Sequence, residues 1–198
     1  MDATDQENRL PEDIAQERRI RACRGRTARP HDLRWMVDIN MLDFEYYLPI
    51  FADALYDTQY PFDILSRNGI IEMLKTAKDR VIPVLPDVVR GIKKALVTEI
   101  PQAMMNACVV IQMLATASPL VGLALIKYYR KLLIPTFAKY KTAGMKFKEG
   151  EIDYGQNRRR LGKIIDETLD LLDKTGGTDA YVEIKYAVPT YESSYRNS

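Results

Sequence analysis

Hydrophobic positions recur at helical spacing along most of the chain. The clearest case lies toward the C-terminal end, where six positions fall at i, i+3, i+4, i+7, i+8 and i+11: Leu161, Ile164, Ile165, Thr168, Leu169 and Leu172. This spacing places them on one face of an amphipathic helix. Glycine commonly follows the last helical turn, so this helix is predicted to end at Gly176-Gly177.

Prolines mark where several other helices should begin. The apolar segment "VIPVLPDVVRGIKKAL" contains Pro83 and Pro86. Proline costs about 3 kcal/mol inside a helix but little at the first helical position. We therefore predict that Pro83 ends a short turn and that Pro86 starts a new helix. By the same reasoning Pro101 and Pro119 each begin a helix, the second running through "LVGLALIKYYRKLL".

Helix-capping and helix-breaking residues divide the region before these prolines into separate helices. Asp43 can cap a helix over "FEYYLPIFADALYD", because its side chain can accept hydrogen bonds from the first backbone N–H groups. Pro61-Phe62 is predicted to open a short helix, "FDILSRN", and Asn68-Gly69 to end it, with "IIEMLKTA" following as a separate piece.

Two segments alternate apolar and polar residues and are predicted to be extended. Trp35, Val37, Ile39 and Met41 alternate with polar residues, the period of a half-buried strand. Val182, Ile184 and Tyr186 alternate with charged residues, which predicts a short strand before Pro189.

A loose repeat suggests how the helices are arranged. "LPIFADAL", "LPDVVRGI" and "IPTFAKYK" begin at residues 48, 85 and 134 and are about 37 and 49 residues apart. HEAT and armadillo repeats have periods of about 40 to 47 residues and stack helix pairs into a solenoid. The predicted fold is therefore all-α, a short and irregular HEAT/armadillo-like α-solenoid with minor extended segments near both ends.

Composition indicates one globular core with two tails. The 198 residues are 46% hydrophobic and 28% charged, with a net charge of +2. Residues 1–30 are polar, too poor in apolar residues to offset their ordering entropy, and are predicted to be a disordered basic arm. Residues 31–186 should form a single helical-repeat domain, and residues 187–198 an extended C-terminal tail.

The compartment is predicted to be the cytosol. The first residues, "MDATDQENRLPEDIAQERRIR", lack the apolar segment of a signal peptide, and Cys23 and Cys108 do not indicate a disulfide framework. The uncharged run from Gln102 to Ile126 is long enough to cross a membrane, but Ser118-Pro119 divides it. We predict a buried helical hairpin there and no membrane association.

The residues offer little for catalysis. The single histidine, His31, has no neighbouring metal ligand, so no metal or other cofactor is predicted. The sequence contains no Walker loop, G-x-G-x-x-G or G-x-S-x-G motif. The acids of "DETLDLLD" fit the solvated face of the last amphipathic helix. A non-enzymatic protein is expected.

Basic clusters are the better candidates for binding. One is the arm between Arg18 and Arg29, and the other surrounds a polar loop: Lys139, Lys141, Lys146, Lys148, Arg158, Arg159 and Arg160. Such clusters attract acidic partners, although solubility alone explains them equally well. Nucleic acid is not expected as the partner, because no basic stretch interleaved with aromatic residues is present.

Several segments together resemble the parkin co-regulated protein family of cilia and flagella. They occur in the family's order between Trp35 and Ser193 and are "LDFEYYLPIFADAL", "YPFDILSRNGIIEML", "VIPVLPDVV", "YYRKLLIP", "IDYGQNRR" and "GGTDAYVEIKYAVPTYES". The resemblance implies a HEAT/armadillo-like protein at the inner junction of axonemal doublet microtubules, bridging the A- and B-tubules. The implied partners are the alpha/beta-tubulin lattice, cilia- and flagella-associated protein twenty, and other microtubule inner proteins.

The resemblance also implies partner-binding residues at both ends of the domain. Trp35 and Ile39 match a tryptophan-centred stretch that docks a small partner in some relatives, although Met36 and Asn40 differ from the lysine and the acid found there. Burial of Trp35 as a core anchor is an equal alternative. The family's tail is matched by Tyr186, Pro189 and Tyr191, which either contact a partner or fold back on the domain.

The leading hypothesis is thus a structural inner-junction protein of the cilium or flagellum, within the cytoskeleton. The residues predicted to face acidic tubulin surfaces are Arg18, Arg19, Arg21, Arg24, Arg158, Arg159 and Arg160. The alternative is a soluble armadillo-like adaptor that binds a peptide or a cargo partner.

Overall fold

The computed structural model describes Leu33, Trp35, residues 37–134, residues 136–137 and residues 154–193. Within these residues the chain is all-helical, as predicted. The α-helices are α2 (Phe44–Asp53), α3 (Phe62–Ala77), α4 (Leu85–Val97), α5 (Pro101–Ala117), α6 (Pro119–Leu125), α7 (Tyr129–Leu133), α9 (Tyr154–Thr175) and α10 (Ala180–Ala187). Short 3-10 helices accompany them: η2 (Ile39–Met41), η3 (Ala54–Tyr56), η4 (Lys78–Val81) and η5 (Ile126–Tyr128).

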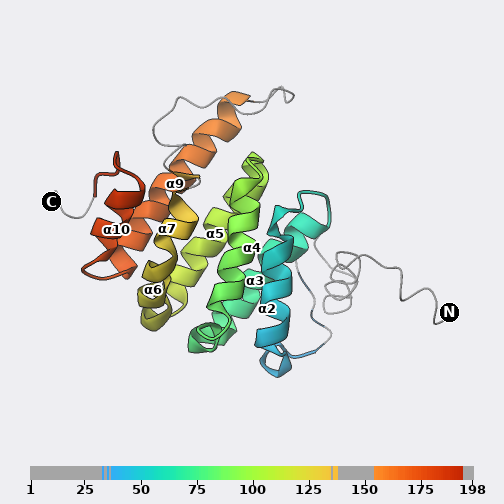
Figure 1. Cartoon of the computed structure of the whole chain (residues 1–198). Helices are drawn as coiled ribbons and strands as arrows, with labels where there is room; N and C mark the ends of the chain where they lie inside the picture. The colour runs from blue at the N-terminus through green and yellow to red at the C-terminus, as the bar shows by residue number, and fades with distance from the viewer. Residues whose placement is uncertain (1–32, 34, 36, 135, 138–153, 194–198) are drawn as a thin grey trace.

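The helices pack in two layers. In the first layer, α4 lies between α2 and α7, and α10 lies against α7 on the far side. In the second layer, α5 lies between α3 and α9. Figure 1 shows the helices following one another across the molecule from α2 to α10. Each layer covers the apolar side of the other, so the outer side of each layer faces solvent.

Helix α5 is the centre of the core. It contacts α3, α4, α6 and α9, and ten of its residues, from Ala103 to Ala115, are buried. A helix in contact with neighbours on most sides needs apolar residues all round, which explains the uncharged run found in the sequence. No helix in the described ranges is long and apolar enough to cross a membrane.

The predicted helix starts are confirmed where they depend on local signals. Asp43 accepts hydrogen bonds from the backbone N–H groups of Glu45 and Tyr46 at 3.1 and 3.3 Å. Pro86 lies in the first turn of α4, and Pro101 and Pro119 are the first residues of α5 and α6.

The predicted break at Asn68-Gly69 is wrong, because α3 runs unbroken through both residues. Gly69 has a packing role instead. A Cβ atom there would lie 2.7 Å from the Phe51 ring, closer than carbon atoms approach without repulsion. The glycine therefore lets the aromatic ring of α2 pack directly on the backbone of α3.

Both predicted strands are also wrong. Residues 39–41 form η2, which Asp38 caps by accepting from the N–H of Asn40. Residues 180–187 form α10, in which Ala180, Ile184 and Ala187 are buried. These positions follow i, i+4 and i+7, so the segment has a helical period that three alternating residues did not reveal.

Two helix boundaries differ from the prediction. The segment after Pro119 divides into α6, η5 and α7 instead of one helix. Helix α9 begins at Tyr154, inside the polar loop that is predicted from the sequence over residues 142–157. Residues 1–30 and 138–153, to which the predicted arm and most of this loop belong, lie outside the described residues.

Candidate interaction surface

Trp35 fastens the segment that precedes α2 to the helical core. Its indole Nε1 donates a hydrogen bond to Glu72 Oε2 of α3 at 2.5 Å. Its ring meets the Phe51 ring edge-on, with centroids 6.0 Å apart. Trp35 and Ile39 are both half-buried. The structure therefore places Trp35 as a core anchor that keeps part of its side chain accessible.

The C-terminal segment folds back onto the core at Tyr191. This side chain is only 1% exposed, and its hydroxyl donates a hydrogen bond to Asp170 Oδ1 of α9 at 2.9 Å. Lys185 Nζ donates to the Tyr191 carbonyl oxygen at 2.7 Å, and the buried Ser193 hydroxyl donates to Asp173 at 2.5 Å. Of the three predicted tail residues, only Tyr186 and Pro189 remain exposed.

Replacing Tyr191 with phenylalanine should lower the free energy of unfolding by about 1–2 kcal/mol, the typical effect of removing a hydrogen bond at a buried site. The ring stays, and the hydroxyl loses its bond to Asp170 and its longer contact of 3.4 Å with Asp173. Tyr186→Phe is the matched control, and its effect should be within about 0.5 kcal/mol because this side chain is exposed. Urea denaturation followed by circular dichroism measures both, and equal effects would contradict the docking of Tyr191.

The structure describes only some of the predicted basic residues. Arg18, Arg19, Arg21 and Arg24 lie outside the described residues. Arg158 and Arg159 belong to the first turns of α9, where side chains are not described, and Arg160 is exposed on the same helix.

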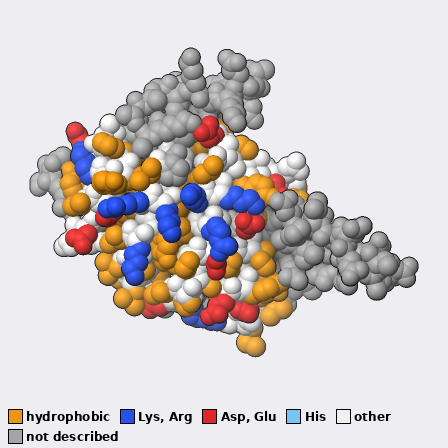
Figure 2. All heavy atoms as spheres, viewed as in Figure 1, with side chains coloured by type: hydrophobic (Ala, Val, Ile, Leu, Met, Phe, Trp, Pro, Cys, Tyr) orange, Lys and Arg blue, Asp and Glu red, His pale blue; other side chains and the backbone are white. Residues whose placement is uncertain are grey.

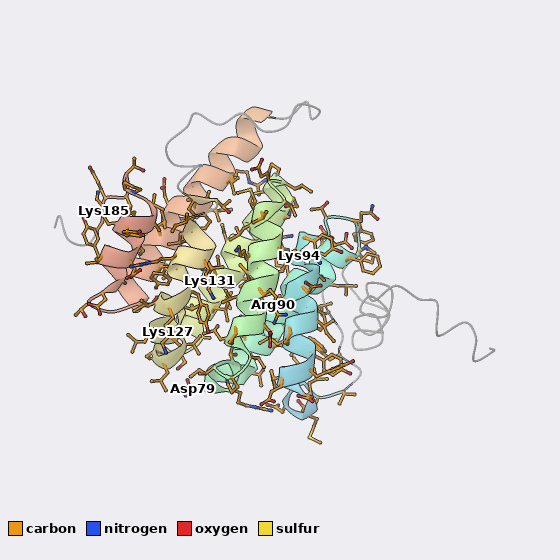
Figure 3. The ribbon with its side chains drawn as sticks, in the orientation of Figure 1. Asp79, Arg90, Lys94, Lys127, Lys131 and Lys185 are labelled. Carbon is orange, nitrogen blue, oxygen red and sulfur yellow. The ribbon has the colours of Figure 1, made fainter. Side chains whose placement is uncertain are left out.

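A different basic surface lies on the outer side of the first layer. We call it the basic band, and it comprises Arg90, Lys93 and Lys94 of α4, Lys127 of η5, Arg130 and Lys131 of α7, and Lys185 of α10. Figure 2 shows Lys and Arg side chains in a row across this face. Figure 3 labels five band residues, which project from three neighbouring parts of the layer.

Three of these cations already have a carboxylate partner. Arg90 pairs with Asp87 one helical turn away, and Lys94 Nζ lies 3.4 Å from Asp53 at the end of α2. Arg130 donates from Nε and one terminal nitrogen to the two carboxylate oxygens of Glu183, at 2.6 and 2.9 Å. Lys93, Lys127 and Lys131 form no ion pair with any residue that the structure describes.

The Arg130–Glu183 pair connects α7 with α10. The hydrogen bond from Arg130 holds the pKa of Glu183 below its usual value, and the same bond raises the pKa of Arg130. The Arg130 guanidinium also lies over the Tyr186 ring, 4.4 Å from its centroid. Because the pair is exposed, water and salt screen it, and it orients Arg130 more than it stabilises the fold.

The exposed charges of α9 are balanced in sign. From Leu161 to its end, the exposed acids Asp166 and Glu167 are matched by the exposed lysines Lys163 and Lys174, whereas Asp170 is half-buried and Asp173 is buried. The solvated face predicted for the acids of "DETLDLLD" is therefore wrong for Asp173, which accepts a hydrogen bond from the Ser193 hydroxyl. No group of three or more potential metal ligands occurs in the described ranges.

Comparison with known proteins decides the family. The sequence model of the parkin co-regulated protein family matches residues 18–193. The chain belongs to this family. A mouse (Mus musculus) relative, "Parkin coregulated gene protein homolog", is 39% identical over 166 residues, which cover 83% of this chain and 68% of the relative.

The region shared with the parkin co-regulated protein family contains every helix of the basic band and the docked Tyr191. Sequence reasoning missed the band because its cations are spread between residues 90 and 185 and never form a run. Two local signals were present, since Arg90, Lys93 and Lys94, and likewise Lys127, Arg130 and Lys131, fall at i, i+3 and i+4 and so share one helical face. The meeting of these two groups depends on the contact between α4 and α7.

Proposed function

We propose that this member of the parkin co-regulated protein family is a non-enzymatic microtubule inner protein at the inner junction of axonemal doublet microtubules. It bridges the A- and B-tubules by binding the alpha/beta-tubulin lattice, cilia- and flagella-associated protein twenty, and other microtubule inner proteins. The observation that carries the proposal is the basic band, a broad cationic face on a packed helical scaffold, in a chain of this family. Such a face suits a large acidic surface.

The scaffold itself supports a bracing role. We infer a short, irregular solenoid of the HEAT or armadillo kind, because α2 packs on α3, α4 packs on α5, and each helix of one pair contacts its counterpart in the next. In solenoids each pair contacts mainly its neighbours and the stack presents extended surfaces. Repetition along a lattice then adds avidity, since many modest interfaces act together.

Fractionation of ciliated cells that express the tagged chain tests this function. After detergent extraction, we expect the protein to remain with the insoluble axoneme through a high-salt wash, and electron microscopy should locate it on the doublet. A tagged soluble protein of similar size is the control. Release by detergent alone would overturn the proposal and favour a soluble armadillo-like adaptor for a peptide or cargo partner.

A further inference from the structure

We propose that the basic band is a docking surface for a carboxylate-rich face of a folded protein. The inference deepens the proposed function and rests on it for the identity of the partner, which is then an acidic surface of the tubulin lattice. The cations of this surface come from α4, η5, α7 and α10. None of them belongs to the basic clusters that were predicted from the sequence to bind a partner.

The charge of the band exceeds that of the whole protein. Its seven cations face three carboxylates, those of Asp53, Asp87 and Glu183, so four positive charges are in excess, whereas the entire chain has a net charge of +2. Neighbouring helix axes lie about 8–10 Å apart, so the band from α4 to α10 extends roughly 20 Å. That length is about twice the Debye length in physiological salt, and only an extended acidic partner can meet both ends.

The types of side chain favour carboxylates over phosphates. Both arginines of the band are occupied by the protein's own carboxylates. The band cations that form no ion pair with a described residue are all lysines: Lys93, Lys127, Lys131 and Lys185, the last of which donates to the Tyr191 carbonyl oxygen. Bidentate recognition of phosphate uses the planar fork of arginine, and binding of single-stranded nucleic acid also uses exposed aromatic faces for stacking. Three aromatic rings beside the band each lie under one of its own cations: Tyr56 under Lys94 at 4.0 Å, Tyr128 under Lys131 at 5.8 Å and Tyr186 under Arg130 at 4.4 Å.

Apolar side chains border the band and favour a folded protein as the occupant. Val97 is 54% exposed at the end of α4, Ile134 is 45% exposed after α7, and Val182 is 64% exposed on α10. Protein interfaces combine apolar contacts with a charged and polar rim. A partner that offers only a flexible line of charge would leave these three side chains in water.

Microtubule co-sedimentation with the full chain tests the assignment. The band variant carries Lys93→Glu, Lys127→Glu and Lys131→Glu, and we expect its dissociation constant to rise at least about tenfold, because charge reversal turns attraction into repulsion. The matched control carries Lys75→Glu, Lys163→Glu and Lys174→Glu. It makes the same change in net charge at exposed lysines of α3 and α9 in the second layer, and its dissociation constant should stay within about twofold of the original.

A second probe separates failure of the inference from failure of the proposed function. Fluorescence anisotropy measures binding of the same three proteins to polyglutamate, to single-stranded RNA and to phosphatidylserine vesicles. The inference is supported if the band variant loses binding to both polyglutamate and microtubules while the control variant keeps both. If the original chain does not bind microtubules, the proposed function fails. Binding to polyglutamate then still tests whether the basic band binds carboxylates. Equal binding of both variants to polyglutamate, or a band effect seen only with RNA or vesicles, would overturn the inference.

Discussion

Replacing Gly91 with alanine should lower the free energy of unfolding by about 3 kcal/mol, near the upper end of overpacking costs. Gly91 lies at the crossing of α4 with α2. A Cβ atom there would lie 2.4 Å from the Ala52 carbonyl carbon and 2.6 Å from the Asp53 backbone nitrogen. Both atoms belong to the backbone, which cannot rotate away as a side chain can. The two helices must therefore separate.

Gly162→Ala is the matched control for this substitution. Gly162 lies inside α9, and a Cβ atom there would meet nothing within 4 Å. Alanine is favoured over glycine in a helix by about 1 kcal/mol, so this variant should be more stable than the original by up to that amount. Urea denaturation followed by circular dichroism measures both changes. Destabilisation of similar size in both variants would contradict a specific close contact between α2 and α4.

Local chemistry explains which parts of the fold could be predicted from the sequence. The starts of α2, α4, α5 and α6 depend on Asp43 or on a proline, whose preference for the first turn is a property of a few consecutive residues. The end of α9 depends on Gly176-Gly177 in the same way. For such features tertiary contacts add little information, and the predictions are confirmed.

Features that depend on distant contacts could not be predicted. Gly69 has the same local signal as a helix-ending glycine, but its role is set by the Phe51 ring of another helix. The sequence predicts a strand around Val182 and Tyr186, but so short an alternation of apolar and polar residues fits both the strand period and the helix period. The contacts of α10 with α7 and α9 decide for the helix. Tertiary packing in these places overrides local preference.

The candidate surface also has features that the sequence could predict and features that depend on the fold. The sequence identified Trp35 and Tyr191 as important, but only the structure places Tyr191 in the core with its hydroxyl on Asp170. The basic band could not be predicted as a unit, because its residues come from separate helices whose order in the layer skips α5. Charge clusters along a sequence and charge clusters on a surface are different quantities, and here they do not coincide.

Stability should decline steeply at alkaline pH. Burial raises the pKa of the Cys108 thiol from 9.0 to about 12, against a hydrogen bond with Thr168 that lowers it. Burial also raises the pKa of Tyr129 above its usual value of 10.0, as does the nearby Asp173. The unfolded chain therefore releases these protons at a lower pH than the native protein. The stabilising effect is complete below pH 9 and is lost as the pH rises further.

The expected slope follows from the number of protons. Between about pH 9 and 10 the difference rises from about half a proton to nearly one proton from Cys108, so the free energy of unfolding should fall by about 1 kcal/mol over this unit, with the slope approaching about 1.4 kcal/mol per pH unit. Above about pH 10 Tyr129 doubles the slope to about 3 kcal/mol per unit, and Tyr191, whose pKa is likewise raised by burial, acts in the same direction. Domains are stable by only about 5–15 kcal/mol, so the protein should unfold near pH 11–12.

Two variants separate the contributions of these groups. Cys108→Ala should remove the slope between pH 9 and 10, because no thiol is then left in α5 to titrate. Tyr129→Phe should leave that slope and reduce the steeper part above pH 10, at the cost of the hydroxyl bond to the Leu172 carbonyl oxygen at 3.0 Å. Urea denaturation at half-unit pH steps measures all three proteins. A slope between pH 9 and 10 that Cys108→Ala leaves unchanged would show that this thiol does not hold its proton in the native core.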